Sequence, residues 1–560
     1  MDIPKEKVES ELESILSTVA SVWVAVVVAF VLRAFMFEAF VIPTGSMAPR
    51  LMGEHWTLQC PSCAREYEFG LDRSNMRSVG YGQPVVPPAA RCPNCNYRYQ
   101  SAKRIDGGDR VLVLKYLYNF TEPEPWEVVV FKNPQNNTQN YIKRLIGLPG
   151  ESIQLMHGDV FVSHDGPDGP WKIRRKPYRV QETMWQVVYN NDYPPSMEWM
   201  SNPASQAPEW VPRQEGQWDT QLEHRRVFGY RGGEPASLDF RSSREWFLPR
   251  YGYNPTSEPQ YDAETDIVND LKLSAFFMPE DDTATLTLSL AAPAGLFEAE
   301  ISADGTVGLY CTSEHLTDGQ RTRWAERKLA DFDAGRGHQV ALTNVDYRAG
   351  LWVDGKLVLE STDQQYPSDF QWARQLASRY GLGGGGPMPA PRLRITGSGG
   401  AFRLRHIRVM RDVYYTNATL NFPAGNRLPT EFDYTLRLVR MGLLDPENNA
   451  GWGTAGRPIE LRDRENDDLD EFFVLGDNSP HSLDGRGWLR AAPTLYLWEK
   501  DGQLQKLWNP GAEPVYRLGT VPRYSMIGRA LFVYWPSGYR IPGLPRLPIL
   551  PNVGKMRFIR

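Results

Sequence analysis

The stretch Pro43-Thr44-Gly45-Ser46-Met47-Ala48-Pro49 follows an apolar N-terminal segment, and Tyr141-Ile142-Lys143-Arg144 comes later in the chain. Neither segment has a histidine beside it. Serine is a weak nucleophile at its ordinary pKa, and a neutral lysine amine can take its proton when the surroundings remove the lysine charge. The two segments therefore predict a Ser/Lys hydrolase at a membrane surface, with Ser46 and Lys143 as the reacting pair.

Lys143 must be buried for this chemistry. Lowering the pKa of a lysine from about 10.4 to near 7 disfavours its ammonium form by about 4 to 5 kcal/mol, and apolar packing can supply that. In an extended strand, Tyr141, Lys143 and Leu145 share one face, which places the amine among large side chains. The pattern alone does not say which face is inside. A strand with two solvated cations, Lys143 and Arg144, is the alternative.

Two further segments bear on the choice between a buried lysine and a solvated one. Together with the serine and lysine segments they make four short sequence motifs, which we call boxes. The four boxes are 43–49, Gly108-Asp109-Arg110-Val111-Leu112-Val113, Lys143-Arg144-Leu145-Ile146-Gly147-Leu148-Pro149-Gly150-Glu151, and Phe473-Val474-Leu475-Gly476-Asp477-Asn478-Ser479-Pro480-His481-Ser482-Leu483-Asp484-Gly485-Arg486. In residue type and in order they resemble the type I signal peptidases. The resemblance covers less than half of the chain, roughly residues 15 to 55, 105 to 165 and 470 to 540.

The resemblance implies a role for each matching residue. Ser46 would attack the scissile carbonyl, and Lys143 would act as general base and then as general acid toward the leaving amine. The Thr44 hydroxyl and the Ser46 amide would form the oxyanion hole. Ser482 would hydrogen-bond and orient the lysine amine.

The resemblance also implies structural support around this site. Asp484 and Arg486 match a pair that braces the loop, most simply as a structural salt bridge, and Asp477 and Arg144 are assigned to the same supporting group. Gly485 departs from the family, which usually has serine between that Asp and Arg. We expect this departure to loosen the loop without abolishing the chemistry.

His481 offers a competing arrangement. Beside Ser482 and near Asp484, it could belong to a Ser-His-Asp triad. Three catalytic groups within four residues rarely converge on one point, so we do not expect this triad.

The N-terminal segment predicts a membrane anchor. The chain is uncharged over 19–32 and stays largely apolar past Arg33 as far as Ile42, a stretch of about 20 residues that suits a spanning helix. We predict a tail over 1–16 and a transmembrane helix over 17–42. A cleavable signal sequence is the alternative, but it would need a basic leading region, and the residues before the apolar run are mainly acidic.

The predicted orientation in the membrane rests on the resemblance, because the charged residues near the apolar segment hardly favour one orientation over the other. The resemblance implies a single-pass protein of the bacterial cytoplasmic (inner) membrane, with its catalytic domain extracytoplasmic. Arg33 can reach the interface, which would leave Ser46 just beyond the lipid.

Composition favours a multidomain β protein. The 560 residues carry a formal net charge of -5, so no basic excess points to nucleic acid. With 17 Trp, 48 Gly and 44 Pro, the chain favours short strands and turns over helical bundles. We predict a mainly β fold, with a signal-peptidase-type β catalytic domain divided into 43–165 and 413–560.

Four of the five cysteines form two Cys-x-x-Cys pairs, Cys60 with Cys63 and Cys92 with Cys95. Two such pairs predict a zinc-ribbon-like insert over 57–100, in which four thiolates hold a structural zinc and leave no open position for catalysis. Two disulfides are the alternative, since an oxidising exterior would permit them. No cofactor is expected for catalysis, and Cys311 is expected to be a buried free thiol.

Two inserted regions separate the lysine box from the last box. We predict an irregular insertion over 166–267 and a β-sandwich over 268–412, which reads as successive strands with a hairpin turn at Asp354-Gly355. The sandwich is similar to laminin-G or concanavalin-like jelly rolls. Such a module would bind a carbohydrate or a protein. Alternatively, it would bind nothing and serve only as a packing domain that enlarges the enzyme.

The leading hypothesis is a membrane-anchored endopeptidase that removes signal peptides from translocated preproteins after a small residue, typically Ala. Its partners would be preprotein signal peptides and the lipid bilayer. One alternative is a self-cleaving repressor-type Ser/Lys peptidase, which the membrane segment disfavours. Another is a catalytically silent, anchored binding protein, which the presence of Ser46, Lys143 and Ser482 disfavours.

Overall fold

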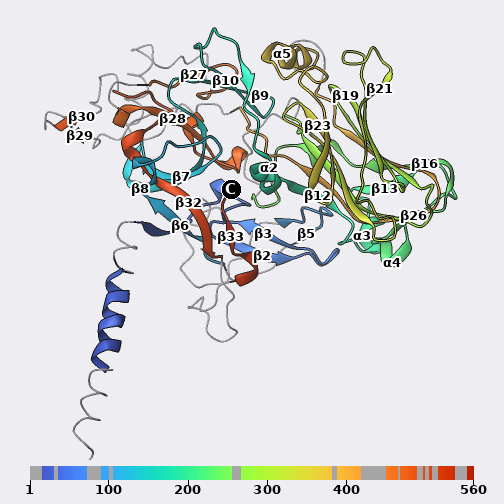
Figure 1. Cartoon of the computed structure of the whole chain (residues 1–560), viewed down its shortest axis with the longest axis horizontal. Helices are drawn as coiled ribbons and strands as arrows, with labels where there is room; N and C mark the ends of the chain where they lie inside the picture. The colour runs from blue at the N-terminus through green and yellow to red at the C-terminus, as the bar shows by residue number, and fades with distance from the viewer. Residues whose placement is uncertain are drawn as a thin grey trace, which may run out of the picture.

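The computed structural model describes residues 15–28, 30, 36–71, 90–99, 105–254, 266–380, 387–417, 450–463, 467–488, 496–498, 504–506, 515–536 and 552–560. As predicted, the fold is mainly β. Figure 1 shows two β-rich bodies beside each other, with an N-terminal helix that points away from both. The first body contains the four boxes, and the second is a β-sandwich.

The first body is built on an eight-stranded sheet in which every neighbouring pair is antiparallel. Its order along the sheet is β1 (Phe37–Val41), β6 (Arg110–Lys115), β32 (Met526–Trp535), β7 (Val128–Asn133), β8 (Asn136–Gly147), β28 (Glu471–Leu475) and β31 (Val521–Pro522), with β33 (Arg557–Phe558) on β32. Strands from the N-terminal part and from the C-terminal part of the chain are therefore interleaved in one sheet.

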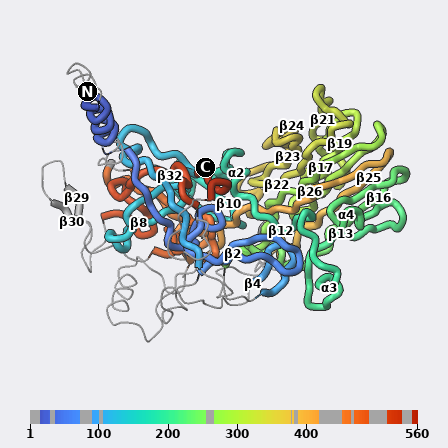
Figure 2. Tube along the Cα trace, turned by 90° about the horizontal axis from the view of Figure 1, so that it is seen from below, coloured from blue at the N-terminus to red at the C-terminus, as the bar shows by residue number. Residues whose placement is uncertain are grey.

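Smaller sheets complete this body. A four-stranded sheet has the order β11 (Lys172–Ile173), β10 (Asp159–Ser163), β9 (Ser152–Met156) and β27 (Ile459–Glu460). The three two-stranded pairs are β2 (His55–Gln59) with β3 (Glu66–Gly70), β4 (Ala90–Arg91) with β5 (Arg98–Tyr99), and β29 (Tyr496–Trp498) with β30 (Leu504–Lys506). In both views β2 to β5 lie between the main sheet and the sandwich (Figures 1 and 2).

The second body consists of two facing antiparallel sheets. The first has the order β14 (Trp218–Asp219), β15 (Phe228–Tyr230), β26 (Phe402–Arg411), β17 (Leu271–Pro279), β22 (His338–Val345), β23 (Arg348–Val353) and β24 (Lys356–Glu360), with β12 (Gln186–Asn190) on β26. The second has the order β13 (Glu209–Pro212), β16 (Gly233–Arg241), β25 (Arg392–Gly399), β18 (Thr285–Ala292), β19 (Gly295–Ser302), β20 (Thr306–Thr312) and β21 (Arg321–Lys328). Their inner faces enclose one apolar core.

Short helices connect these strands. The α-helices of the described residues after β1 include α2 (Tyr178–Met184), α3 (Met197–Met200), α4 (Leu222–Arg225) and α5 (Phe370–Ser378). The 3-10 helices are η1 (Gly45–Met47), η3 (Leu117–Asn119), η4 (Arg244–Phe247), η5 (Asp467–Leu469), η6 (Ser479–His481), η7 (Gly485–Gly487), η8 (Arg523–Ser525) and η9 (Val553–Lys555).

The prediction of an irregular insertion over 166–267 was wrong. Strands β12 to β16 lie within it and extend both sheets of the sandwich, β12, β14 and β15 on one sheet and β13 and β16 on the other. Four of these five strands, β12 to β15, have five residues or fewer, which is too short for an alternating pattern to be detected. The sandwich therefore begins near residue 186 rather than at 268.

The hairpin turn at Asp354-Gly355 was predicted correctly. It joins β23 to β24, and both residues have positive φ, 49° and 75°. A two-residue hairpin of this kind needs positive φ at both positions, which Asp tolerates and Gly adopts freely.

The predicted transmembrane helix over 17–42 was too long at its C-terminal end. The chain is helical over 15–28, but Phe37–Val41 forms β1 and pairs with β6 in the main sheet. Glu38 is the one charged residue of this strand, which lies at the end of the sheet order. Among the described residues, no helix is both long enough and apolar enough to cross a bilayer.

Candidate active site

Ser46 and Lys143 meet beside β8, an inner strand of the main sheet. Ser46 lies in η1, just after β1, and Lys143 lies in β8. The Lys143 Nζ atom donates a hydrogen bond of 2.6 Å to the Ser46 Oγ atom and one of 3.2 Å to the Ile142 carbonyl oxygen. Proton transfer between a nucleophile and a base requires this separation.

The Lys143 side chain is enclosed by protein. It is only 3% exposed, and its ammonium nitrogen lies 5.3 Å from the centre of the Tyr141 ring. Burial lowers the pKa of Lys143 to about 8, although the negative charges of Asp484 and Asp477 oppose the shift. Arg144 is buried as well, so the alternative of two solvated cations was wrong.

Arg144 fixes the strand that carries Lys143. Its Nε and Nη2 atoms donate to the two carboxylate oxygens of Asp477 at 2.7 and 2.6 Å, and its Nη1 atom donates to the Trp126 carbonyl oxygen at 2.6 Å. Both members of the pair are fully buried. This bidentate contact joins β8 to the loop that follows β28.

Arg486 holds the second half of that loop. It forms a buried bidentate pair with Asp484 at 2.9 and 2.8 Å, and it also donates to the carbonyl oxygens of Thr416 and Ser479. Burial alone would raise the pKa of Asp484, but the charge and hydrogen bonds of Arg486 hold that pKa below its ordinary value. The Asp484 carboxylate also accepts hydrogen bonds from the backbone amides of Gly476 at 3.0 Å and Arg486 at 3.2 Å.

Two glycines permit the close packing of this loop. A Cβ atom on Gly476 would lie 2.5 Å from the Ser46 carbonyl oxygen, so only glycine lets the loop approach the nucleophile. A Cβ atom on Gly485 would lie 2.6 Å from the Gly519 carbonyl oxygen and 2.8 Å from the Phe473 ring. Gly485 was expected to loosen the loop, but it is buried there and allows tight packing instead.

Ser482 does not make the predicted hydrogen bond to Lys143. Its side chain is buried, and its Oγ atom has no hydrogen-bond partner among the described residues. The Ser482 Oγ atom faces Gly476, where an added Cβ would lie 2.1 Å from it. Because the Ser482 Oγ atom bonds none of the described residues and Asp484 pairs with Arg486, that part of the chain shows no hydrogen-bonded triad of Ser482, His481 and Asp484.

Thr44 lies on the exposed side of the nucleophile. It precedes η1 in an extended conformation, and its side chain caps no backbone amide of that turn. The hydroxyl therefore stays accessible beside Ser46.

The sandwich insertion reaches the nucleophile loop, which sequence analysis missed. Asn254 and Asn478 exchange two side-chain hydrogen bonds, at 2.8 and 2.7 Å. Asn478 in turn donates from its side chain to the Gly45 carbonyl at 2.9 Å and from its backbone to the Ser46 carbonyl at 3.0 Å. The Tyr251 hydroxyl donates to the Asp477 carbonyl oxygen at 3.2 Å. No sequence pattern around 251–254 signals this contact.

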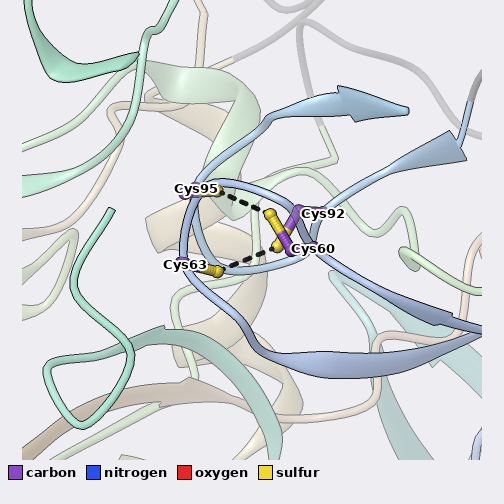
Figure 3. Close-up of side chains that lie close together, drawn as sticks. All are labelled: Cys60, Cys63, Cys92 and Cys95. Atoms are coloured by element: carbon purple, nitrogen blue, oxygen red, sulfur yellow. Dashed lines mark hydrogen bonds between the residues drawn. The ribbon is translucent and has the colours of Figure 1, made fainter. Parts of the chain in front are cut away.

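The four paired cysteines meet at one point, as Figure 3 shows. The Sγ atoms of Cys60 and Cys95 are 3.5 Å apart, and those of Cys63 and Cys92 are 3.6 Å apart. All four are buried, unlinked by disulfides and within 4.8 Å of one another. A disulfide needs about 2.0 Å between sulfurs, whereas a tetrahedral zinc with bonds of about 2.3 Å places its sulfurs about 3.8 Å apart. The four thiols therefore fit a zinc ion.

This cysteine cluster is connected to the nucleophile through Tyr253. The Tyr253 ring packs between Gly70, at the end of β3, and Gly45, where added Cβ atoms would lie 2.3 and 2.4 Å from it. The Gly70 amide also donates to the Tyr253 carbonyl oxygen. Movement of the β2–β3 hairpin would therefore displace the turn that carries Ser46.

Part of the chain matches a known family. Residues 98–222 match the family model described as signal peptidase, peptidase S26. The matched range contains Lys143 and Arg144. Ser46 and the loop after β28 lie outside it.

Curated relatives that match are named signal peptidase I. The protein of Buchnera aphidicola subsp. Baizongia pistaciae is 24% identical over 152 residues, which are 27% of this chain and 36% of that protein. The protein of Rickettsia typhi is 29% identical over 144 residues, which are 26% of this chain and 42% of that protein. The chain thus spans less than half the length of these curated relatives.

Solved structures resemble the chain only loosely. A carbohydrate-binding module, CBM66, from Bacillus subtilis has a TM-score of 0.22 and 11% identity, covering 36% of this chain and 94% of that chain. The laminarinase catalytic domain from Thermotoga maritima has a TM-score of 0.25 and 11% identity, covering 41% and 99%. At these TM-scores the likeness carries no argument about ligands.

Proposed function

We propose that the chain is a membrane-anchored Ser/Lys endopeptidase that cleaves signal peptides from translocated preproteins. The observation that carries this proposal is the 2.6 Å hydrogen bond between the Lys143 amine and the Ser46 hydroxyl, formed in a buried setting. The match of residues 98–222 to the signal peptidase family supports the choice of substrate.

The proposed reaction proceeds through an acyl-enzyme. Neutral Lys143 takes the Ser46 proton while Ser46 Oγ attacks the scissile carbonyl carbon, and the carbonyl oxygen becomes an oxyanion stabilised by the Thr44 hydroxyl and the Ser46 amide. The tetrahedral intermediate collapses, the C–N bond breaks, and the Lys143 ammonium protonates the leaving amine. Lys143 then removes a proton from water, which attacks the Ser46 ester carbonyl carbon; the C–Oγ bond breaks, and the Lys143 ammonium returns that proton to the Ser46 oxygen, so that both groups are regenerated.

The supporting residues keep this pair in register. Arg144 with Asp477, and Arg486 with Asp484, fix the two sides of the Lys143 pocket. Asn478 fixes the carbonyls of Gly45 and Ser46. Ser482, buried without a partner among the described residues, is proposed to orient the amine when substrate enters.

The membrane anchor belongs to the proposal. In the helix over 15–28, side chains such as Trp23 and Val24 are almost two-thirds exposed, at 65% and 64%, and apolar side chains of this kind are stabilised in lipid. Because β1 begins at Phe37, a short distance along the chain from this helix, Ser46 would lie close to the bilayer surface. We propose the bacterial inner membrane, with the catalytic domain on the extracytoplasmic side. A protein or carbohydrate ligand for the sandwich stays a prediction.

The substrate assignment is tested with the full chain in detergent. A preprotein with Ala at the −1 and −3 positions should be cut once, after the −1 Ala, as read by mass spectrometry of the new N-terminus. A matched preprotein with bulky residues at these positions should stay intact. If the chain cleaves only itself, the result supports the self-cleaving peptidase instead. If it cleaves nothing, the result supports the catalytically silent binding protein.

The rate of this cleavage should depend on pH through Lys143. Only the neutral amine accepts a proton, so the rate should rise roughly tenfold per pH unit below about pH 8 and level off above it. The measurement is kcat/KM against pH, with a substrate that has no titrating group near the cleavage site. A flat profile across this range would contradict a lysine base.

We also propose that Cys60, Cys63, Cys92 and Cys95 hold a structural zinc ion. Four thiolates would close its coordination shell, so zinc would fix the β2–β3 and β4–β5 pairs and take no part in the reaction. Its effect on catalysis would be indirect, through the contact of Tyr253 with Gly45 and Gly70.

Zinc content should therefore follow the paired cysteines. The purified chain should contain about one zinc per molecule by elemental analysis, and Cys92→Ser should remove most of it and lower the thermal midpoint. Cys311→Ser is the matched control, because Cys311 is equally buried but lies in the sandwich. Retention of full zinc content in Cys92→Ser would contradict the assignment.

A further inference from the structure

A second group of ionisable side chains lies where the sandwich joins the first body. Asp159 begins β10 of the first body, whereas Asp270 and Asp346 come from the sandwich, next to β17 and between β22 and β23. One carboxylate oxygen from each of the three lies within 4.8 Å of the others. These groups are remote from the cysteine cluster in sequence, and the proposed peptidase reaction uses none of them.

The positive charge near these carboxylates is insufficient to balance them. Lys176 is buried and forms ion pairs with Asp346 and, at 3.0 Å, with Asp412. In the described part of the chain, this ammonium is paired with two carboxylates, and Asp159 and Asp270 lie within 4.8 Å of one of them, Asp346. Burying carboxylates without compensating charge is strongly unfavourable.

Neutral oxygen donors complete the arrangement. Asn344 is 3% exposed, and its Oδ1 atom has no hydrogen-bond partner among the described residues, while its Nδ2 atom donates to the Asn269 carbonyl at 3.1 Å. The Asn269 Oδ1 atom likewise has no partner in that part of the chain. Both residues line a cavity of about 60 Å³ together with Asp159 and Asp270, so unused amide oxygens and carboxylates share one small space.

We propose that Asp159, Asp270 and Asp346, with the amide oxygen of Asn344, bind a calcium ion that ties the sandwich to the first body. Calcium accepts six to eight oxygen ligands in flexible geometry, whereas magnesium demands a near-ideal octahedron and zinc prefers nitrogen and sulfur. The divalent charge together with Lys176 would nearly balance the four carboxylates. A cavity of this size also leaves room for water to complete the coordination shell.

The test uses the full chain in detergent after treatment with a chelator. Terbium is the luminescent probe, because Tyr347, Tyr366 and Tyr414 line the same cavity and can sensitise it. We expect saturable terbium luminescence that calcium displaces, and a thermal midpoint that rises with added calcium. Asp270→Asn and Asn344→Leu should each weaken calcium binding at least about tenfold.

The matched control is Asp304→Asn, an exposed carboxylate paired with Lys328 on the surface, which should leave calcium binding unchanged. Zinc content, measured in the same samples, separates this site from the cysteine cluster. If the wild-type chain binds no calcium, the proposal is overturned, whether or not the variants fold. Binding that persists unchanged in a folded Asp270→Asn variant would overturn it as well.

Discussion

Ser46→Ala and Lys143→Met should each abolish preprotein cleavage while leaving the fold intact. Losing the nucleophile should lower kcat by about 10⁶-fold, and losing the general base should lower it by about 10²- to 10⁴-fold. The KM should change little, because neither group is expected to contribute much to substrate binding. Cleavage is measured in single-turnover and steady-state assays with purified full-length chain.

The stability of Lys143→Met separates a catalytic lysine from a structural one. Lys143 is buried and its pKa is depressed, so its ammonium form is destabilised in the fold. Replacing it with an apolar side chain of similar length should leave the thermal midpoint unchanged or raise it, as is common for strained active-site groups. Lys132→Met and Ser201→Ala, which alter exposed residues, are the controls and should retain full activity. Wild-type rates in Ser46→Ala and Lys143→Met would rule out the Ser/Lys pair.

Arg486→Met should destabilise the protein by about 3 to 5 kcal/mol, because it leaves the Asp484 carboxylate buried without its partner. The Thr416 and Ser479 carbonyls would also lose a donor. Urea unfolding followed by tryptophan fluorescence measures the loss. Arg323→Met removes an exposed ion pair with Glu326 and should cost at most about 1 kcal/mol.

Two further measurements distinguish the contribution of charge from simple loss of packing. In the double variant Arg486→Met/Asp484→Leu no buried charge is left unpaired, so much of the stability should return. In Arg486→Met the positive charge that lowers the pKa of Lys143 is gone while Asp484 stays. The pH at which cleavage reaches half its maximum should therefore move upward. A midpoint that falls or does not move would contradict this electrostatic account.

The sequence predicted which residues meet at the candidate site better than it predicted their surroundings. Ser46 and Lys143 could be paired because each box has a distinctive order of residue types, and the alternation around Lys143 offered an apolar face. The Asp354-Gly355 turn was predictable since few residue pairs tolerate positive φ at both positions. The longer strands with alternating apolar residues, such as β18, were also predictable, because this alternation lies within the strand's own sequence.

Features that depend on distant contacts were not predictable. The Asn254–Asn478 pair joins residues that are 224 positions apart, and neither segment has a periodic pattern. The strand β1 was mistaken for helix because Phe37–Val41 is mostly apolar, and only its pairing with β6 makes it a strand. The hydrogen bond predicted for Ser482 requires a side-chain direction, which residue order does not encode.

The insertion between β8 and β28 would also delay the appearance of the proposed activity during synthesis. The strand that carries Lys143 gains its neighbour β28 only after the whole sandwich has been translated, since Arg144 and Asp477 are 333 positions apart. Domains generally fold as units as they leave the ribosome, N-terminal parts first. The nascent polypeptide should therefore remain unable to hydrolyse itself or its neighbours until residues 471–486 have emerged.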